Sequence, residues 1–199
     1  MAFGLLLVCV SMQLSFLQAL SVHFRQATAK DVSAARKILF SEAMNPLSVS
    51  EATLLVASSD GATDRSANDD MVGFGQIRRL NDDYSELASL YVLPSYRKRG
   101  IGTALVQELL ERYENSKDSS SGSSSRTAAA ATTTTTTCTD SGKVCLLTLA
   151  PTVPFYEPHG FVVVEDTTDL PTSVQFEIQA GSAISKFLGN QLVCMVRDP

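Results

Sequence analysis

The sequence has little positive charge for its size. Sixteen lysine and arginine residues stand against 21 aspartate and glutamate residues, which gives a formal net charge of −5. Because a nucleic-acid-binding surface needs clustered cations to neutralise phosphates, this balance argues against a general nucleic-acid-binding protein. An acidic chain mildly attracts cationic substrates such as amines.

The sequence also lacks the residue patterns of metal, redox and nucleotide sites. It has two histidines and four cysteines, and Cys9, Cys138, Cys145 and Cys194 form neither a zinc knuckle nor a C-x-x-C pair. No Ser-His-Asp or Cys-His set is apparent, and neither G-x-G-x-x-G nor G-x-x-x-x-G-K-[ST] occurs. We therefore expect that the protein has no metal site and that its cysteines are free thiols. A Cys145–Cys194 disulfide is conceivable only if the two strands are neighbours.

The N-terminal 20 residues differ from the rest of the chain. Residues 2–20 are almost wholly apolar and uncharged, about the length of a signal peptide or a short membrane helix. Ala19 is a passable cleavage site, but no lysine or arginine precedes the apolar run. We predict a signal peptide or apolar leader at 1–20, with a signal anchor and a packed N-terminus as alternatives. A leader implies secretory or plastid entry; without one the protein is cytoplasmic, and membrane contact is expected only for an uncleaved anchor.

Hydrophobic periodicity divides residues 21–199 into alternating strands and helices. Strands are predicted at residues 23–28, 54–58, 71–78, 84–93, 144–149, 161–165 and 191–197. Helices are predicted at residues 32–43, 103–113, 154–158 and 171–188. Asp31 is the expected N-cap of the first helix, which Pro46 terminates. This mixed order predicts one α/β domain with a mixed sheet.

A low-complexity segment interrupts this pattern. Residues 116–141 consist mainly of serine, alanine and threonine, with almost no large apolar side chain. Such a segment cannot support a core. We predict a disordered insertion in a surface loop, which costs little because loop-closure entropy grows only logarithmically with length.

A basic, glycine-containing turn lies between the strand at 84–93 and the helix at 103–113. It reads Arg97-Lys98-Arg99-Gly100-Ile101-Gly102-Thr103. The first N–H groups of a helix lack partners and carry partial positive charge, so they bind phosphate. Glycines at 100 and 102 let the backbone approach closely, and the three cations add a positive field. The alternative is a glycine-rich turn with solvated cations.

With its flanks, this turn resembles the acyl-CoA motif of the GNAT superfamily, L-x-V-x-P-x-x-R-x-x-G-I-G. The opening HFRQATAKDVSAARKILF, the strand VGFGQIR and VPFYEPHGFVVVED at residues 153–166 are similar to other parts of that fold. The C-terminal part is similar to a plant, algal and cyanobacterial subgroup. The resemblance implies an α/β (α+β) acyl-CoA N-acyltransferase fold, a mixed sheet of six to seven strands flanked by helices. The fourth and fifth strands would splay apart around the cofactor.

The resemblance also implies roles for particular residues. Glu86 would be the general base; the structural alternative is a solvated carboxylate at the end of a strand. Tyr156 would be the general acid; the structural alternative is an aromatic side chain that only packs. The acetyl-CoA site would comprise Tyr91, Val92, Arg97, Lys98, Arg99, Gly100, Ile101, Gly102 and Thr103. In this site, backbone groups of Tyr91 and Val92 would form hydrogen bonds with the pantetheine arm. The backbone N–H of Val92 would donate to the oxyanion. His23, Glu157 and His159 are expected to be bystanders.

The resemblance implies an acyltransferase that carries acetyl groups from acetyl-CoA to a primary amine on a small molecule or protein. The alternatives are an acyl-CoA-binding sensor or scaffold without turnover and a tethered structural protein. The acceptor stays open, and residues 44–50 and 171–189 are its expected walls. The Asn that many relatives place between Leu149 and Phe155 is missing here, and the insertion lengthens the path into the fifth strand.

Overall fold

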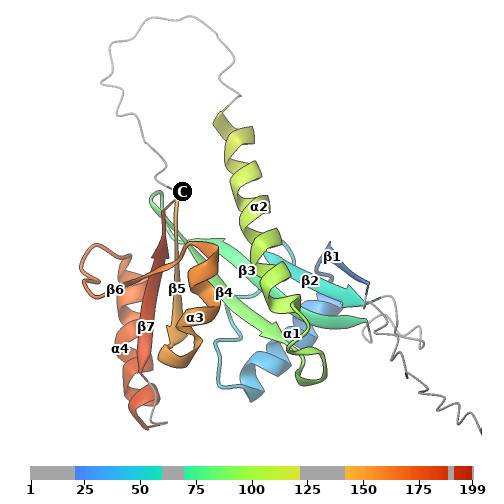
Figure 1. Ribbon diagram of the computed structural model, residues 1–199, viewed down its shortest axis with the longest axis horizontal. Helices are drawn as coiled ribbons and strands as arrows, with labels where there is room; N and C mark the ends of the chain where they lie inside the picture. Colours follow the sequence, from blue (N-terminus) through green and yellow to red (C-terminus); the bar gives the residue numbers. More distant parts are fainter. Residues whose placement is uncertain (1–20, 60–69, 122–141, 188–190, 199) are drawn as a thin grey trace, which may run out of the picture.

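The computed structural model describes residues 21–59, 70–121, 142–187 and 191–198. In that part of the chain seven strands form one sheet in the order β1-β2-β3-β4-β5-β7-β6, with helices on both faces (Figure 1). The strands are β1 (Val22–Gln26), β2 (Leu54–Ser59), β3 (Met71–Arg79), β4 (Tyr84–Val92), β5 (Lys143–Leu149), β6 (Val162–Val164) and β7 (Leu192–Arg197). The helices are α1 (Ala29–Ser41), α2 (Ile101–Ser121), α3 (Val153–Tyr156) and α4 (Thr172–Phe187). The predicted mixed sheet is confirmed. The predicted leader and residues 122–141 of the predicted insertion lie outside the described residues.

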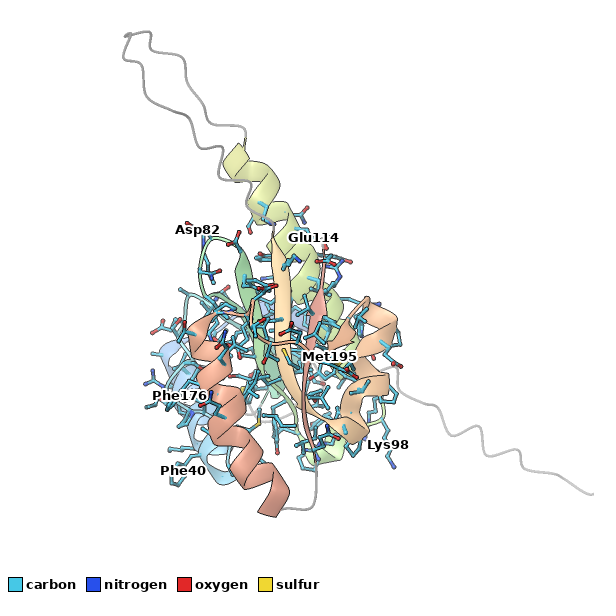
Figure 2. All side chains as sticks on the ribbon, turned by 90° about the vertical axis from the view of Figure 1, so that its left-hand side faces the viewer. Phe40, Asp82, Lys98, Glu114, Phe176 and Met195 are labelled. Atoms are coloured by element: carbon cyan, nitrogen blue, oxygen red, sulfur yellow. The ribbon has the colours of Figure 1, made fainter. Side chains whose placement is uncertain are left out.

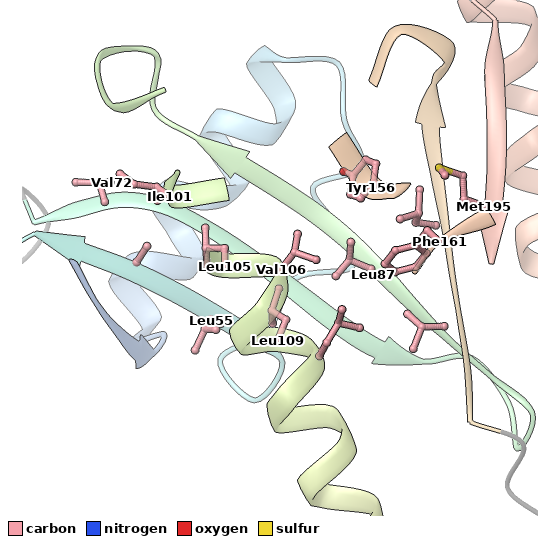
Figure 3. Close-up of a cluster of buried hydrophobic side chains, with 14 residues drawn as sticks. Leu55, Val72, Leu87, Ile101, Leu105, Val106, Leu109, Tyr156, Phe161 and Met195 are labelled. Atoms are coloured by element: carbon pink, nitrogen blue, oxygen red, sulfur yellow. The ribbon is translucent and has the colours of Figure 1, made fainter. Parts of the chain in front are cut away.

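The core lies on both faces of the sheet. On one face, Leu105, Val106 and Leu109 of α2 pack against Leu55 and Val72, and Figure 3 shows this cluster along α2. On the other face, residues of α1 pack against Val56 and Phe74 in a second cluster. Every residue of β2 is therefore buried, because successive side chains of a strand point to opposite faces and both faces are covered.

The first helix begins one turn earlier than predicted. Its N-cap is Thr28, whose hydroxyl accepts from the backbone N–H of Asp31, while the Asp31 carboxylate accepts from the backbone N–H of Thr28. Asp31 is therefore the third helical residue of a capping box, and its assignment as N-cap was wrong. The helix ends at Ser41, five residues before Pro46.

The helix after the basic turn is longer than predicted. It begins at Ile101 rather than Thr103 and runs to Ser121 instead of Tyr113. Leu105, Val106, Leu109 and Leu110 are buried, as the predicted amphipathic stripe requires. The first six residues that we assigned to the insertion, 116–121, are helical.

The two cysteine strands are neighbours. Strands β5 and β7 pair antiparallel with Leu147 opposite Cys194 and Cys145 opposite Val196. Both thiols are free and buried. Burial is the largest cause that raises the pKa of Cys145 to about 12 and that of Cys194 to about 11. The condition for a Cys145–Cys194 disulfide, neighbouring strands, is therefore met, but the two cysteines form no disulfide. Across the described residues, no helix combines the length and apolarity needed to span a membrane.

Candidate active site

The two central strands separate after a short parallel contact. Strands β4 and β5 pair only at Tyr84–Lys143, Ser85–Val144 and Glu86–Cys145. Beyond Glu86 they diverge, so among the described strands β4 has a neighbour on its β3 side alone. The splayed fourth and fifth strands that the sequence implied are therefore present.

A pocket of about 610 Å³ lies where the strands part. Residues 86–90 of β4 and 147–149 of β5 form its inner walls, and Tyr156 of α3 lies between the diverging strands (Figure 3). Residues 42–45 and Ser48, after α1, Arg78 of β3, and residues of α4 including Glu177 also line it. Both segments expected to wall the acceptor site thus contribute to one pocket.

The basic turn ends where α2 begins. Gly100 has φ +79°, in the left-handed region that favours glycine, and its carbonyl accepts from the N–H of Ala104, which makes it the residue before the first helical turn. A Cβ on Gly100 would meet no heavy atom of the described residues within 4 Å, so its surface is open. A Cβ on Gly102 would lie 3.3 Å from the Phe155 ring. The unpaired N–H groups of the first turn thus begin beside α3, which carries Tyr156.

The three cations of this turn have different surroundings. The Arg97 Nε donates to the carbonyl of Val92 at 2.8 Å, and its guanidinium lies 5.2 Å from the centroid of the Tyr91 ring. Arg99 lies over the Tyr96 ring at 5.5 Å. Lys98 is exposed, and its side chain points away from the body of the molecule (Figure 2). Arg97 and Arg99 are thus positioned by aromatic rings, while Lys98 contributes charge at the surface.

Strand β4 contains a bulge that the sequence did not reveal. Gln76 pairs with Ala88 and Phe74 with Tyr91, so Ser89 and Leu90 together oppose Gly75. Ser89 has φ +56°. Regular strand alternation would place Glu86, Ala88 and Leu90 on one face, but Leu90 packs with Leu87 in the α2 cluster. The extra residue shifts the alternation by one position and turns Tyr91 toward the α1 side.

Bulge and open edge together fix the direction of the Val92 backbone. The N–H of Leu93 donates to Val72 on β3, and adjacent residues of a strand direct their N–H and C=O groups to alternate edges. The N–H and C=O of Val92 therefore point away from β3, toward the edge that β5 leaves uncovered. A Cβ at Gly73 would lie 2.9 Å from the carbonyl oxygen of Tyr91, which shows how closely β3 approaches here.

Glu86 is a buried carboxylate in the pocket wall, 5% exposed. Its Oε2 accepts from the Arg78 Nε at 2.7 Å and lies 2.6 Å from the Arg78 Nη2. Burial raises the pKa of Glu86, and the neighbouring Glu177 raises it further, whereas the Arg78 charge lowers it; the net direction is upward. A solvated strand-end carboxylate, the structural alternative, does not describe this residue.

Tyr156 is a buried phenol that also lines the pocket. Its ring makes edge-to-face contacts with Phe155 at 4.8 Å and Phe161 at 6.0 Å. Burial raises its pKa to about 12, and a side-chain hydrogen bond with Thr148 of β5 opposes that shift. The ring of Tyr156 therefore packs against its aromatic neighbours, and the residue also lines the pocket.

Three charged residues of the pocket were missed by the sequence analysis. Arg78 joins Glu86 to Glu177, whose Oε1 lies 3.2 Å from the Arg78 Nη2. Glu42, the C-cap residue of α1, accepts at 2.9 Å from the hydroxyl of Tyr91. A charged residue carries no local signal of a partner that is distant in the sequence, so no sequence pattern identified these three.

The expected bystanders do not line the pocket. The ring centroids of His159 and Phe155 are 5.9 Å apart. Burial lowers the pKa of His159, and the positive charge of Arg197 lowers it further. His23 and Glu157 lie on β1 and the short turn after α3. Within the described ranges, no group of three or more histidine, cysteine, aspartate or glutamate side chains is arranged to hold a metal ion.

A family model described as an acetyltransferase (GNAT) domain matches residues 50–163, more than half of the chain. A comparison with curated protein sequences gives no match.

Solved structures share the fold. Rv2747 from Mycobacterium tuberculosis, in complex with CoA and NLQ, is 21% identical with a TM-score of 0.56, and the match covers 89% of this chain and 99% of that one. The N-acetylglutamate synthase of Neisseria gonorrhoeae, with CoA and N-acetyl-glutamate, is 16% identical with a TM-score of 0.57; the match covers 89% of this chain but 35% of the synthase. An acetyltransferase of the GNAT family from Staphylococcus aureus is 14% identical with a TM-score of 0.53, covering 89% and 99% of the two chains.

Proposed function

Because the chain belongs to the GNAT acetyltransferase family, we propose that it transfers an acetyl group from acetyl-CoA to the primary amine of an acceptor by direct attack. The observation that carries this proposal is the pocket between β4 and β5. It joins an uncovered strand edge, a buried carboxylate and a buried phenol. In this proposal the open edge of β4 and the start of α2 bind acetyl-CoA, and the side chains of Glu86 and Tyr156 line the same pocket.

The residues of the turn fit the pyrophosphate of acetyl-CoA. The first N–H groups of α2 have no helical partner, and the surface of Gly100 is open. Arg97 and Arg99 add positive charge beside them. The similar Neisseria and mycobacterial structures hold CoA, which supports this assignment.

The open edge of β4 fits the pantetheine arm. Backbone groups at this edge have no β5 partner beyond Glu86, so an amide-containing chain can pair with them as an added strand does. The N–H of Val92 points to this side. It is our candidate donor to the oxyanion that develops on the acetyl carbonyl.

Glu86 is proposed to take a proton from the acceptor amine. An alkylammonium has a pKa of about 10.4, so the amine must be deprotonated before its nitrogen can attack. Both Arg78 contacts involve Oε2, and Oε1 makes no hydrogen bond with any residue that the structure describes. That oxygen is the one proposed to receive the proton, directly or through water.

Tyr156 is proposed to meet the departing sulfur. As the new C–N bond forms, the C–S bond breaks and leaves negative charge on the sulfur. A phenol with a pKa of about 12 stays protonated there, but full transfer to a thiolate whose thiol has a pKa of about 8.5 is uphill. Tyr156 therefore acts as a hydrogen-bond donor that stabilises the thiolate.

The phosphate turn is tested by a matched pair at Gly100. Gly100→Asn and Gly100→Asp introduce side chains of nearly the same shape, and both residues tolerate a positive φ better than most. Only Asp adds a negative charge. We expect Asp to weaken acetyl-CoA binding at least tenfold relative to Asn in titration calorimetry. Equal affinities for the two variants would place the pyrophosphate elsewhere.

A further inference from the structure

The proposed acceptor pocket has an excess of negative charge. Among the described residues that line it, the charged side chains are Glu42, Arg78, Glu86 and Glu177. With the three carboxylates ionised, the single guanidinium leaves a net charge of −2. An acceptor that enters this pocket therefore gains from positive charge and loses from negative charge.

Arg78 is already committed to protein carboxylates. It contacts Glu86 at 2.6–2.7 Å and Glu177 at 3.2 Å, and its side chain is 26% exposed. A carboxylate on the acceptor would have to compete with one of these two partners for the cation. Recognition of an amino acid through its α-carboxylate is thus disfavoured by the contacts present.

The carboxylates form a series from the interior to the mouth of the pocket. The Glu86 side chain is 6% exposed, the Glu177 side chain 35%, and Glu42 is exposed. Apolar residues from β5, α4 and β7, among them Leu147, Ala180 and Leu192, lie in the same wall. A methylene chain fits such a surface, while charged groups at its two ends meet carboxylates at different depths.

We propose that the acceptor is a small aliphatic diamine or polyamine, with its reacting amine at Glu86 and its second ammonium at the outer carboxylates Glu177 and Glu42. The inference rests on the proposed acetyl transfer and adds the acceptor class. It predicts rejection of acceptors that carry a carboxylate. The pocket of about 610 Å³ is large enough for a chain of several carbons with an amine at each end.

Three acceptors of one chain length test the proposal: 1,4-diaminobutane, n-butylamine and 4-aminobutyrate. They carry an ammonium, a methyl group and a carboxylate at the end remote from the reacting amine. We expect kcat/KM, from CoA release at one pH and low salt, to be about tenfold higher for the diamine than for butylamine. The excess over aminobutyrate should be about a hundredfold. The two equivalent amines of the diamine account for only about a factor of two of that difference.

A charge-neutral variant places the effect in the pocket. Glu177→Gln removes an outer carboxylate and releases Arg78 from one partner, so the ratio of kcat/KM for diaminobutane to that for aminobutyrate should fall at least fivefold. Glu111→Gln, an exposed position on α2 that does not line the pocket, changes the net charge equally and should leave the ratio unchanged. Acetyl-CoA affinity and the melting temperature of both variants serve as folding controls.

The outcomes separate this inference from the proposed function. Absence of acetyl-CoA binding in calorimetry would refute the transferase proposal itself. Binding of acetyl-CoA together with equal or greater use of aminobutyrate, or with transfer to none of the three amines, would overturn the acceptor class alone. An unchanged ratio in Glu177→Gln would show that the preference does not arise at this carboxylate.

Discussion

The Tyr91 hydroxyl donates a 2.9 Å hydrogen bond to Oε1 of Glu42 and so joins the open strand β4 to the end of α1. The guanidinium of Arg97 lies over the same ring, 5.2 Å from its centroid. One side chain therefore contacts both the turn proposed to hold the pyrophosphate and a wall of the proposed acceptor pocket. Phe74 holds the ring from the sheet, with the two centroids 5.7 Å apart.

The Tyr91→Phe variant tests the link between that wall and catalysis. The ring contacts with Phe74 and Arg97 remain. The hydroxyl loses its bond to Glu42 and its hydrogen bond with Arg97, while Arg97 keeps its bond to the Val92 carbonyl. Because a net hydrogen bond contributes about 0.5–1.5 kcal/mol and Glu42 is exposed, we expect the acceptor KM to rise about threefold. The acetyl-CoA Kd should stay constant. Tyr113→Phe on α2 is the matched control. A higher Kd for acetyl-CoA together with an unchanged acceptor KM would contradict the link.

The pH dependence of turnover tests Glu86. Burial raises its pKa above the ordinary value of about 4.3, and a general base must be ionised to act. Activity should therefore rise with pH through a midpoint above that of an exposed glutamate. Glu86→Gln should lower kcat about a hundredfold and remove this acidic limb, whereas a second rise near the amine pKa persists. A Gln variant with the wild-type pH profile would exclude Glu86 as the base.

The basic turn was predictable because its signals are local. A strand ends at Val92, glycines follow the cations, and an amphipathic helix begins, so adjacent residues determine the geometry. The Arg78–Glu177 contact depends instead on two residues 99 positions apart that meet only after α4 packs beside the sheet. Sequence periodicity carries no information on such a pairing, and the acceptor pocket was therefore only partly foreseen.

The bulge in β4 escaped prediction for a different reason. A positive φ is usually marked by glycine, asparagine or aspartate, but here Ser89 adopts it. Its hydroxyl accepts a hydrogen bond from the buried Gln76 side chain at 3.2 Å, so the conformation depends on tertiary contacts. Regular period-two alternation would therefore place Leu90 on the wrong face.

The capping box makes stability at low pH depend on Asp31. Its burial alone would raise the pKa, but hydrogen bonds from Arg25 and Thr28 hold the pKa below its ordinary value. A carboxyl whose pKa is lower in the folded state stabilises the fold above its unfolded pKa of about 3.9 and loses this contribution as pH falls through the folded value. Asp31→Asn should cost about 2 kcal/mol at pH 7 in urea denaturation. The difference from the wild type should shrink below about pH 4; a difference independent of pH would contradict this origin.

The close approach of β3 to β4 predicts a large effect at Gly73. A Cβ there would lie 2.9 Å from the Tyr91 carbonyl oxygen, a backbone atom that cannot rotate away. We expect Gly73→Ala to destabilise the protein by about 2–3 kcal/mol in thermal or chemical denaturation. Gly100→Ala, where the added methyl meets open space, should cost about 1 kcal/mol through its positive φ alone. Equal costs at the two sites would show that β3 and β4 separate without penalty.

The Tyr156 hydroxyl can be separated from its ring. In Tyr156→Phe the ring contacts with Phe155 and Phe161 remain, so the melting temperature should change little. If the hydroxyl stabilises the departing thiolate, kcat should fall about tenfold to a hundredfold with an unchanged acetyl-CoA Kd. Thr148→Val removes the protein partner of the hydroxyl and leaves it free to meet the sulfur, so it should retain most of kcat. An unchanged kcat in Tyr156→Phe would reduce this residue to its packing role, because the aromatic ring without its hydroxyl would then be sufficient.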